Sequence, residues 1–578
     1  MTKNQVRAAA AVLALGSLAT TLAACGGSSS GGGSDNAKAT SGGTLYYYVD
    51  KPVEHTDPQR TYVGKDITNW TRLVYRQLVA FPISTDADVA NKPVADLATD
   101  TGTSSNNAET WKFTLKDGVK WQDGKAVTCD DLKYGASRAF ATDVITGGPN
   151  YILTYLDVPE GKDGLPEYTG PYKSSAAGKA AFDKAITCDG NTITYNFKKP
   201  WPDFPLAVAS LHMMDPYRQD KDQGNKSNYQ IVSNGPYKLQ GAWDKEKGAT
   251  LVRNPNYAKS TDSTKIRKAL PSKIVFEFGI QAETIYDRLI ADSGNDKYAV
   301  TSKSVPPAYY SRITGAVAKR TVNVKAPYME YALPNFKKLT NVKVRQALAM
   351  ATDQQGYIDA GGGSKAYGAA KSIVNPAVNG YKENPAFADI PEKGDAAAAK
   401  KLLQEAGVSI PYPITYTYPS SDTQDKQAAA LKEGWDAAGF KTTLDGLGDT
   451  YYDVVQKPSN SADVIWGSWG ADWPSAITVT PPLFDSRPNL SSASNGQDYG
   501  NYKSDAFNAL VDKAQESADL NAQTTALQQA DAQLGSDVAY IPLAVDKFYM
   551  TRGSKVTGYV VDPASSMYPD LGAIGVQQ

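Results

Sequence analysis

The sequence of 578 residues predicts an α/β fold made of more than one domain. Strand patterns dominate the first half of the chain, where apolar and polar residues alternate with a period of two. Helical patterns with clear start signals become more frequent further along. Residues 44–578, which follow a Gly/Ser-rich stretch, are too many for a single hydrophobic core. The sequence has no internal repeat of fixed period, which argues against solenoids and propellers.

Residues 1–24 are predicted to be a signal peptide. Lys3 and Arg7 make a charged start, residues 8–22 are apolar, and small residues follow. The apolar run is shorter than the ~20 residues that a membrane-spanning helix needs. The end, Leu22-Ala23-Ala24-Cys25, resembles the lipobox of bacterial lipoproteins, which implies that Cys25 is lipidated. Ordinary secretion with a coincidental cysteine is the alternative.

Residues 25–43 are predicted to be a lipidated, flexible tether. They are almost entirely Gly, Ser, Ala, Thr and a few polar residues, which cannot bury enough apolar surface to become ordered. Such a segment lets a folded body turn freely above a membrane. We therefore expect a soluble body held by one lipid at the outer face of the cytoplasmic membrane, in a Gram-positive, actinobacteria-like cell.

The strand signals are strongest in two segments. Apolar side chains alternate in residues 111–115, and Asp117-Gly118 and Asp123-Gly124 supply turns on either side of residues 119–121. This pattern predicts a hairpin. A further strand is predicted in residues 192–198, where the same alternation recurs.

Several helices are predicted from their start signals. Asp395 is expected to cap a helix over residues 396–406, and Asp505 is expected to open another. A third helix is predicted to end at Gly535. The pair Asp130-Asp131 is best explained as a helix start, with Asp at the cap and in the first turn.

Two cysteines remain once Cys25 is assigned to lipidation: Cys129 and Cys188. In an exported protein, one disulfide between them is the simplest explanation. Two separate buried thiols are the alternative, because the sequence contains no information on the distance between them.

The charge balance excludes a polyanion-binding surface. Without Lys3 and Arg7 the chain carries 58 basic and 61 acidic residues, a net charge near −3, with no Lys/Arg cluster. Nucleic acid as a partner is therefore not expected. The 35 Tyr and 9 Trp residues suit ligand contact, since these rings combine a large contact area with a polar group.

The sequence offers little support for catalysis, a metal or a cofactor. Only His55 and His212 are present, and no Cys-x-x-Cys or His-x-x-x-His pair suggests a metal site. Residues 467–470 lack the spacing of a nucleophile elbow. Residues 363–368 begin like a phosphate loop, but Ala369 replaces the required lysine. We expect neither an enzyme nor a bound cofactor or metal.

Several sequence blocks occur in a recognisable order. The most specific is residues 111–134, a strand-hairpin-helix segment that begins Trp-Lys-Phe-Thr-Leu-Lys-Asp-Gly. The later blocks are residues 233–239, 253–257, 342–353, 405–407, 467–474 and 540–543. Over essentially the whole mature chain, this pattern resembles the bacterial extracellular solute-binding proteins of family 5, the group of oligopeptide- and dipeptide-binding proteins.

The resemblance implies a particular α/β architecture: a bilobal, periplasmic-binding-protein-like clamp of type II, cluster C, with an extra N-terminal subdomain. Lobe I would comprise residues 44–69, 201–327 and 547–578. The family-specific subdomain would comprise residues 70–200, which contain both remaining cysteines. Lobe II would comprise residues 328–546, joined to lobe I through two crossing segments.

The resemblance also implies a ligand site. Asp472, in a Gly-Ala-Asp sequence, matches the aspartate that pairs with the α-amine of a bound peptide. Its alternative role is a turn or capping carboxylate. Ser468, Trp469 and Gly470 match a strand whose backbone pairs with the peptide, and residues 62–64 match the opposing stretch. Together they would sandwich an extended ligand as an added strand.

The opposing stretch consists of Tyr62, Val63 and Gly64. Additional aromatic residues are expected around the ligand. Trp466 belongs to the same strand as Trp469, and strand alternation is expected to bury at least one nearby tryptophan in the core. Tyr328 and Tyr331 lie near the first expected crossing, where relatives have pocket tyrosines.

The expected function is that of the binding lipoprotein of an ABC importer, which captures oligopeptides or dipeptides between two lobes and delivers them to membrane permease subunits. We expect a monomer. One alternative is a binding lipoprotein for another solute, such as an oligosaccharide, a chelated metal or a signal peptide. The other is a surface hydrolase that uses carboxylates from distant parts of the chain. Recovery of a chemically unchanged ligand distinguishes binding from hydrolysis.

Overall fold

The structure is a computed structural model that describes residues 39–146, 150–161 and 164–577. All of these residues belong to one compact unit, Ser34–Gln578. The predicted signal peptide, the lipidated cysteine and residues 25–38 of the predicted tether lie outside the described residues. Among the described helices, none combines the length and the apolar character that crossing a bilayer requires.

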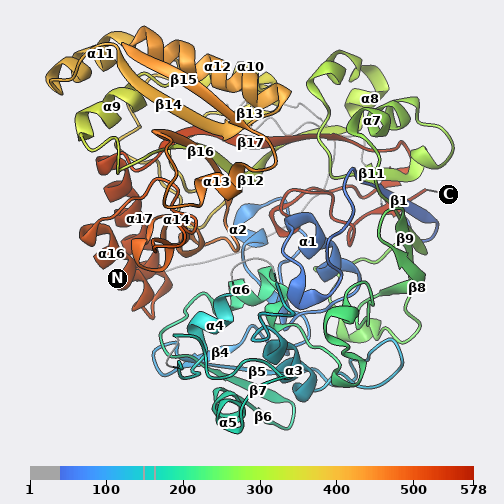
Figure 1. Ribbon diagram of the computed structural model, residues 1–578. Helices are drawn as coiled ribbons and strands as arrows, with labels where there is room; N and C mark the ends of the chain where they lie inside the picture. Colours follow the sequence, from blue (N-terminus) through green and yellow to red (C-terminus); the bar gives the residue numbers. More distant parts are fainter. Residues whose placement is uncertain (1–38, 147–149, 162–163, 578) are drawn as a thin grey trace, which may run out of the picture. The chain divides into compact units, whose positions relative to one another are not determined.

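A five-stranded sheet combines the start of the described chain with residues 237–301 (Figure 1). Its order is β11-β1-β10-β9-β8, in which β1 is parallel to β10 and β11 and the other pairs are antiparallel. The bounds are β1 Thr44–Tyr48, β8 Tyr237–Asp244, β9 Gly248–Arg253, β10 Lys273–Glu277 and β11 Ala299–Thr301. In β10, Ile274 and Phe276 are buried between less buried neighbours, so alternate residues face the core. Helix α1 (Gly64–Leu73) packs Trp70 into the same core.

A six-stranded sheet of order β13-β17-β12-β16-β14-β15 is built from residues 321–551. Its bounds are β12 Thr321–Pro334, β13 Tyr367–Gly368, β14 Tyr412–Pro419, β15 Phe440–Leu447, β16 Val464–Gly470 and β17 Ile541–Thr551. Strand β14 is parallel to β15 and β16, and helix α12 (Asp422–Ala437) makes the crossover from β14 to β15. Helices α10 (Gln354–Ala360), α11 (Ala396–Glu405) and α12 lie beside β14 and β15 (Figure 1).

Two long strands, β12 and β17, connect the six-stranded sheet to the neighbourhood of the five-stranded one. Residues 321–325 pair with 547–551, and residues 329–332 pair with 541–545, with an irregularity between Lys325 and Met329. At one end of β17, the Tyr549 carbonyl accepts a hydrogen bond from the Val305 N–H, just after β11. Figure 1 shows β17 running from beside β13 towards β11.

A four-stranded antiparallel sheet of order β4-β5-β7-β6 is formed by residues 103–196. Its bounds are β4 Thr103–Ser105, β5 Thr110–Thr114, β6 Ile186–Asp189 and β7 Thr192–Asn196. Strand β7 confirms the strand predicted from the alternation in this region. The buried rings of Phe113, Tyr195 and Phe204 pack together above the sheet.

The predicted hairpin is present around the second of its two turns but not around the first. Strand β5 pairs with β4 and β7, whereas residues 119–121 pair with 125–127 around Asp123-Gly124. Both turn glycines adopt positive φ, 80° at Gly118 and 89° at Gly124. The first turn thus takes the chain out of the sheet, and only the second closes a tight hairpin.

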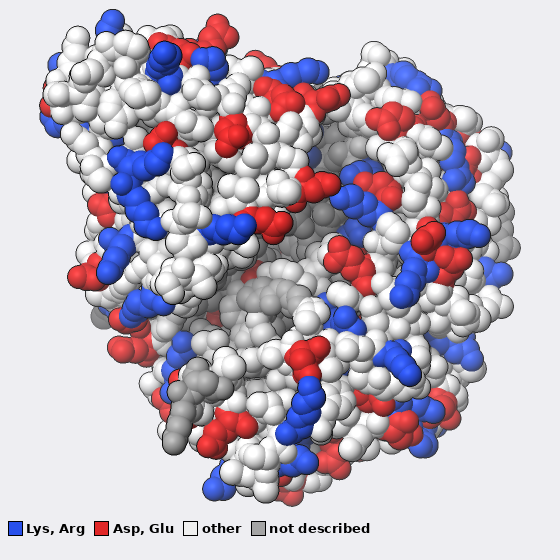
Figure 2. All heavy atoms as spheres, viewed as in Figure 1, with Lys and Arg blue, Asp and Glu red and all other residues white. Residues whose placement is uncertain are grey.

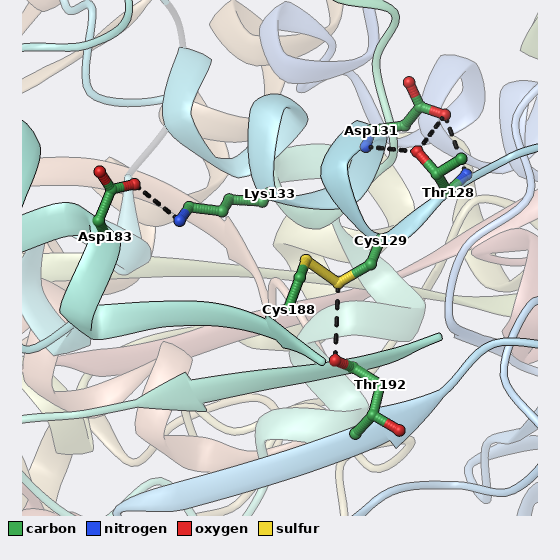
Figure 3. Close-up of a disulfide and its surroundings, with 7 residues drawn as sticks. All are labelled: Thr128, Cys129, Asp131, Lys133, Asp183, Cys188 and Thr192. Carbon is green, nitrogen blue, oxygen red and sulfur yellow. Dashed lines mark hydrogen bonds and ion pairs between the residues drawn. A yellow bond between two sulfur atoms is a disulfide. The ribbon is translucent and has the colours of Figure 1, made fainter. Parts of the chain in front are cut away.

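The predicted disulfide between Cys129 and Cys188 is present, with 5.9 Å between the two Cα atoms (Figure 3). Cys129 is the first residue of α3 (Cys129–Arg138), and Cys188 lies on β6. The cap of α3 is Thr128, which forms a capping box with Asp131. The aspartates therefore lie in the first turn, as predicted, but neither of them is the cap.

The helices predicted from start signals are present with small shifts. Asp395 caps α11 (Ala396–Glu405) by accepting a hydrogen bond of 2.8 Å from the Ala398 N–H. Helix α16 (Asp505–Gln515) is capped by Ser504, so the predicted cap Asp505 is its first residue. Helix α17 (Leu520–Asp537) extends two residues past Gly535.

The remaining elements are short or lie at the surface of the sheets. The helices are α2 Ala87–Ala90, α4 Tyr151–Tyr155, α5 Ala176–Ala185, α6 Phe204–Ser210, α7 Ala282–Ala291, α8 Gly315–Lys319, α9 Val342–Met350, α10 Gln354–Ala360, α13 Tyr451–Val455, α14 Thr480–Phe484 and α15 Ser486–Asn489. The strands are β2 Val79–Ala80, β3 Val94–Ala95, β18 Val556–Thr557 and β19 Gly575–Val576.

Glu330, on β12, is a buried acid at the junction of the long strands. It is 6% exposed and accepts a hydrogen bond of 2.6 Å from the Tyr357 hydroxyl, and it forms no ion pair in the described part of the chain. Burial raises the pKa of Glu330 to about 7. Burial and the charge of Glu330 together raise the pKa of Asp546 on β17. The ionised form of Glu330 therefore destabilises the folded protein.

We predict that Glu330→Gln stabilises the protein at pH 8. The folded pKa of Glu330 lies above its ordinary value, so the folded state holds the proton more tightly than the unfolded state. The stability that the protonated Glu330 contributes is fully present below pH ~4.5 and is lost as the pH rises through about 7. Thermal unfolding should show a gain of about 1–3 kcal/mol at pH 8 and a smaller difference at pH 5. Glu283→Gln, on the exposed face of α7, is the control and should leave the free energy of unfolding unchanged at both pH values. Equal melting temperatures for Glu330→Gln and wild type at pH 8 contradict the prediction.

Candidate ligand-binding site

A cavity of about 450 Å³ lies between segments that are far apart in the sequence. Its wall draws on residues 62–72, 209–211, 375–378, 466–474 and 563–567. Figure 2 shows the molecule hollowed near the centre of this face, beside the place of α1 in Figure 1. The volume lies within the range that small-ligand sites occupy, roughly 300–1,000 Å³.

Strand β16 forms one wall of the cavity with an edge that is only partly paired. One edge pairs with β12 along the whole strand, from Val464 to Gly470. The other edge pairs with β14 only at Val464 and Ile465. In the described chain, residues 466–470 therefore have a strand neighbour on one side only. The end of β16 thus presents backbone groups that an extended ligand can pair with.

Two glycines allow close approach around the ring of Tyr328, on β12. A Cβ atom on Gly470 would lie 2.8 Å from the Tyr328 ring, which is too close for any side chain. A Cβ atom on Gly64, the first residue of α1, would lie 3.0 Å from the Tyr328 hydroxyl oxygen. Tyr328 thus fills the space between α1 and β16, and all three residues line the cavity.

Asp472, two residues after β16, receives hydrogen bonds from two tyrosines. Its Oδ1 accepts from the Tyr62 hydroxyl and its Oδ2 accepts from the Tyr151 hydroxyl. Its backbone N–H donates to Thr478 Oγ1 at 3.1 Å. Burial raises the pKa of Asp472 to about 6, while the two tyrosine hydrogen bonds act in the opposite direction. No cation of the described chain pairs with this carboxylate, so the negative charge that it carries above its pKa of about 6 is uncompensated.

Tyr151 was missed by the sequence analysis. It is the first residue of α4, 321 positions before Asp472, and it belongs to no sequence block. Its ring lies edge-on to that of Trp473, with 4.6 Å between centroids. Nothing local in the sequence could have identified it, because only the tertiary fold brings α4 to the end of β16.

The tryptophans around β16 are held by hydrogen bonds from their indole nitrogens. Trp466 donates to the Tyr357 hydroxyl at 3.1 Å, and Trp469 donates to the Thr478 carbonyl at 2.8 Å. Trp473 donates to Asp203 Oδ2. All three rings contribute to the cavity wall, with Trp466 and Trp473 largely buried.

Eight of the ten residues that the sequence suggested for the site line the cavity: Tyr62, Gly64, Tyr328, Trp466, Ser468, Trp469, Gly470 and Asp472. The other two do not. Val63 is 39% exposed and caps α1. Tyr331 is 2% exposed and packs in the core against Gly467, because residues three apart on a regular strand face opposite sides.

The described residues contain no group of three or more His, Cys, Asp or Glu side chains that could hold a metal ion. The groups that the cavity offers a ligand are the Asp472 carboxylate, the Arg72 guanidinium, a strand edge and aromatic rings.

Comparisons with known proteins agree on one family. The family model described as "Bacterial extracellular solute-binding proteins, family 5 Middle" matches residues 92–491. The periplasmic oligopeptide-binding protein OppA of Salmonella typhimurium is 25% identical over 493 residues, covering 79% of this chain and 80% of that protein. The oligopeptide-binding protein OppA of Bacillus subtilis is 24% identical, covering 77% and 78%. Among solved structures, "Clavulanic acid biosynthesis oligopeptide binding protein 2" superposes with a TM-score of 0.85 at 25% identity, covering 95% of this chain and 99% of that one.

Proposed function

Because the chain belongs to the bacterial extracellular solute-binding proteins of family 5, we propose that it captures peptides in this cavity and delivers them to the permease of an ABC importer. The observation that carries the proposal is the pairing of an uncompensated carboxylate, Asp472, with the half-paired end of β16. Relatives named as oligopeptide-binding proteins support the peptide class.

Asp472 is proposed to bind the α-amine of the peptide. A carboxylate has about four acceptor positions, of which the two tyrosine hydroxyls occupy two. An ammonium group has three donors and supplies the missing positive charge, so it completes the partners of this carboxylate. The peptide backbone would then continue along the free edge of β16, where it extends the sheet by one strand.

Closure of two lobes around the ligand is proposed as the mechanism of capture. The contacts of Asp472 with Tyr62 and Tyr151, and of Trp473 with Asp203, join segments more than 250 residues apart. A ligand that touches both sides favours the closed state by its extra affinity for that state. The permease would then recognise the closed form.

The three sheets support the proposed division of the chain. We assign the five-stranded sheet to lobe I (44–69, 201–327 and 547–578) and the six-stranded sheet to lobe II (328–546). The four-stranded sheet then belongs to the subdomain (70–200). The long strands β12 and β17 would be the crossing segments, since the two proposed boundaries between lobe I and lobe II fall within them.

We further propose that the protein is a monomeric lipoprotein, anchored through Cys25 at the outer face of the cytoplasmic membrane, and that it does not catalyse a reaction. The family description, which names extracellular proteins, supports the location. Incorporation of labelled palmitate into wild type but not into Cys25→Ser tests the anchor.

Retention without turnover tests the peptide proposal. The purified protein is incubated with a defined mixture of free-amine peptides of two to five residues. Bound peptides are recovered after denaturation, and their masses are measured by mass spectrometry. We expect a subset of the peptides to be retained with unchanged masses. Cleavage products would instead support the hydrolase alternative, and retention of none of the peptides would contradict the proposal.

We predict that Tyr151→Phe shifts the pH dependence of amine binding upward. Amine binding needs ionised Asp472, so affinity should fall as the pH drops through about 6. Removal of one hydroxyl donor raises the pKa of Asp472, and the midpoint should rise by about 1 unit. Titration calorimetry at a series of pH values between 5 and 7.5 measures this midpoint.

Tyr155→Phe is the matched control for this titration. Tyr155 lies on the same helix but stacks on Trp201, with 4.1 Å between ring centroids, and makes no contact with Asp472. The midpoint pH for amine binding by Tyr155→Phe should equal that of wild type. Identical midpoints for Tyr151→Phe and Tyr155→Phe would show that the Tyr151 hydroxyl does not act on the carboxylate.

A further inference from the structure

The charges of the cavity wall are few and unequal. In the part of the chain that the structure describes, Arg72 and Asp472 are the only charged residues that line the cavity. Asp472 has two neutral hydrogen-bond donors and no cation. Arg72, in contrast, already has an anionic partner. A positively charged ligand group can therefore pair with Asp472, whereas Arg72 is already paired with an acid of the protein.

Arg72 is held within the protein by strong polar contacts. Its side chain is 2% exposed, and its Nε donates to Asp570 Oδ2 at 3.0 Å. Its Nη1 donates to the Phe81 carbonyl at 2.9 Å. Asp570 is 1% exposed, so this ion pair is shielded from water and its two charges compensate each other.

A second acid lies next to the same ion pair. Asp562 is fully buried, and its Oδ2 has no hydrogen-bond partner. Burial first, and then the charge of Asp570, raise the pKa of Asp562 to about 7, while Arg72 lowers it. Two carboxyl groups thus adjoin one guanidinium. The Nη2 of Arg72 makes no hydrogen bond to any residue that the structure describes. A ligand carboxylate placed there would nevertheless be the third acid around a single cation.

The remaining walls favour a cation. Seven aromatic side chains line the cavity: Tyr62, Phe81, Tyr328, Tyr452, Trp466, Trp469 and Trp473. The faces of such rings attract ammonium and guanidinium groups through their quadrupole, by about 0.5–2 kcal/mol each when water is excluded. They offer no comparable attraction to a carboxylate.

We propose that the cavity is selective for positively charged ligands: it accepts one amine at Asp472 and contains no receptor for a carboxylate. The ligand class is a peptide or amino compound with net positive charge, whose carboxyl group is either absent, amidated or outside the cavity. This inference rests on the proposed function for its peptide ligands and goes beyond it by assigning their charge.

Four forms of one tetrapeptide test the inference: tetraalanine with free ends, with an acetylated amine, with an amidated carboxyl end, and with both modifications. Titration calorimetry at pH 7.4 gives each affinity. We expect the amide to bind at least as tightly as the free acid. Acetylation should weaken binding by about 100-fold or more, since it removes the charge that pairs with Asp472.

Two further probes test the charge selectivity with ligands that are not peptides. Lysine and cadaverine carry the same side-chain amine, but cadaverine lacks the carboxylate. We expect cadaverine to bind about tenfold or more tightly than lysine. Preference for cadaverine together with no binding of any tetrapeptide would leave the charge selectivity in place and contradict the peptide function.

Two results overturn the inference. One is an amidated tetrapeptide that binds threefold or more weakly than the free acid, because this would identify a carboxylate receptor at Arg72. The other is lysine binding as tightly as cadaverine or more tightly. Failure of all six probes to bind would contradict both the inference and the peptide function.

Discussion

Asp472→Asn is expected to lower the affinity for a peptide with a free amine by about 30- to 5,000-fold. Loss of one partner from a desolvated, hydrogen-bonded charge pair costs about 2–5 kcal/mol. Asparagine has nearly the same shape and keeps one acceptor for the two tyrosines, so the fold should be preserved. Titration calorimetry at pH 7.4 measures the effect, because Asp472, with a pKa of about 6, is ionised there.

The controls for this substitution vary both the residue and the ligand. Asp453→Asn makes the same change at an exposed position of α13 and should leave affinity unaltered. The N-acetylated peptide should bind wild type and Asp472→Asn within about threefold of each other, because its amine is neutral. Equal affinity of the two proteins for the free-amine peptide would refute the role of Asp472.

Loss of the disulfide is expected to destabilise the four-stranded sheet region by about 4 kcal/mol. The bridge joins residues 59 positions apart, and closing a loop of this length restricts the unfolded chain by about that amount. The variant that replaces both Cys129 and Cys188 by serine should therefore unfold at a lower denaturant concentration. Fluorescence reports on this region, since Trp111, Trp121 and Trp201 belong to its core.

Reduction is the control for the disulfide prediction. Dithiothreitol should shift the unfolding of wild type to that of the double serine variant, and it should not shift the variant itself. Superimposable unfolding curves for oxidised and reduced wild type would contradict the prediction.

Local signals in the sequence were sufficient for single elements. Asp395 and the alanine-rich run after it predicted α11 almost to the residue, because a capping side chain and helix propensity act within a few positions. The alternation around Tyr195 predicted β7 for the same reason. The cystine followed from counting the cysteines of an exported chain.

Pairings between distant segments were harder to predict. The turn at Asp117-Gly118 indicated a hairpin, but β5 takes its partners from residues 103–105 and 192–196. A strand selects its neighbours by burial and register across the whole sheet, which a local turn does not report. The fold class was nevertheless predictable, because blocks spread along the chain resemble one family.

In the candidate site, too, residues that are adjacent in sequence could be predicted, whereas residues from distant segments could not. Asp472 and the end of β16 can be grouped from the sequence because they are contiguous in one block. Arg72 reaches the cavity, and Tyr151 reaches Asp472, only through tertiary packing. Tyr331 is close in sequence to residues of the cavity wall, but strand geometry directs its side chain to the core. Charge selectivity depends on Asp562 and Asp570, which no spacing in the sequence connects to Arg72.

Identification of the small molecule that the protein carries from its native cell is the most direct test of amine capture at Asp472. The protein is purified without added ligand and denatured, and the released material is analysed by mass spectrometry. We expect short peptides or amino compounds with a free amine and net positive charge. A neutral sugar or an anionic metal chelate would contradict this expectation, because neither provides a partner for the Asp472 carboxylate.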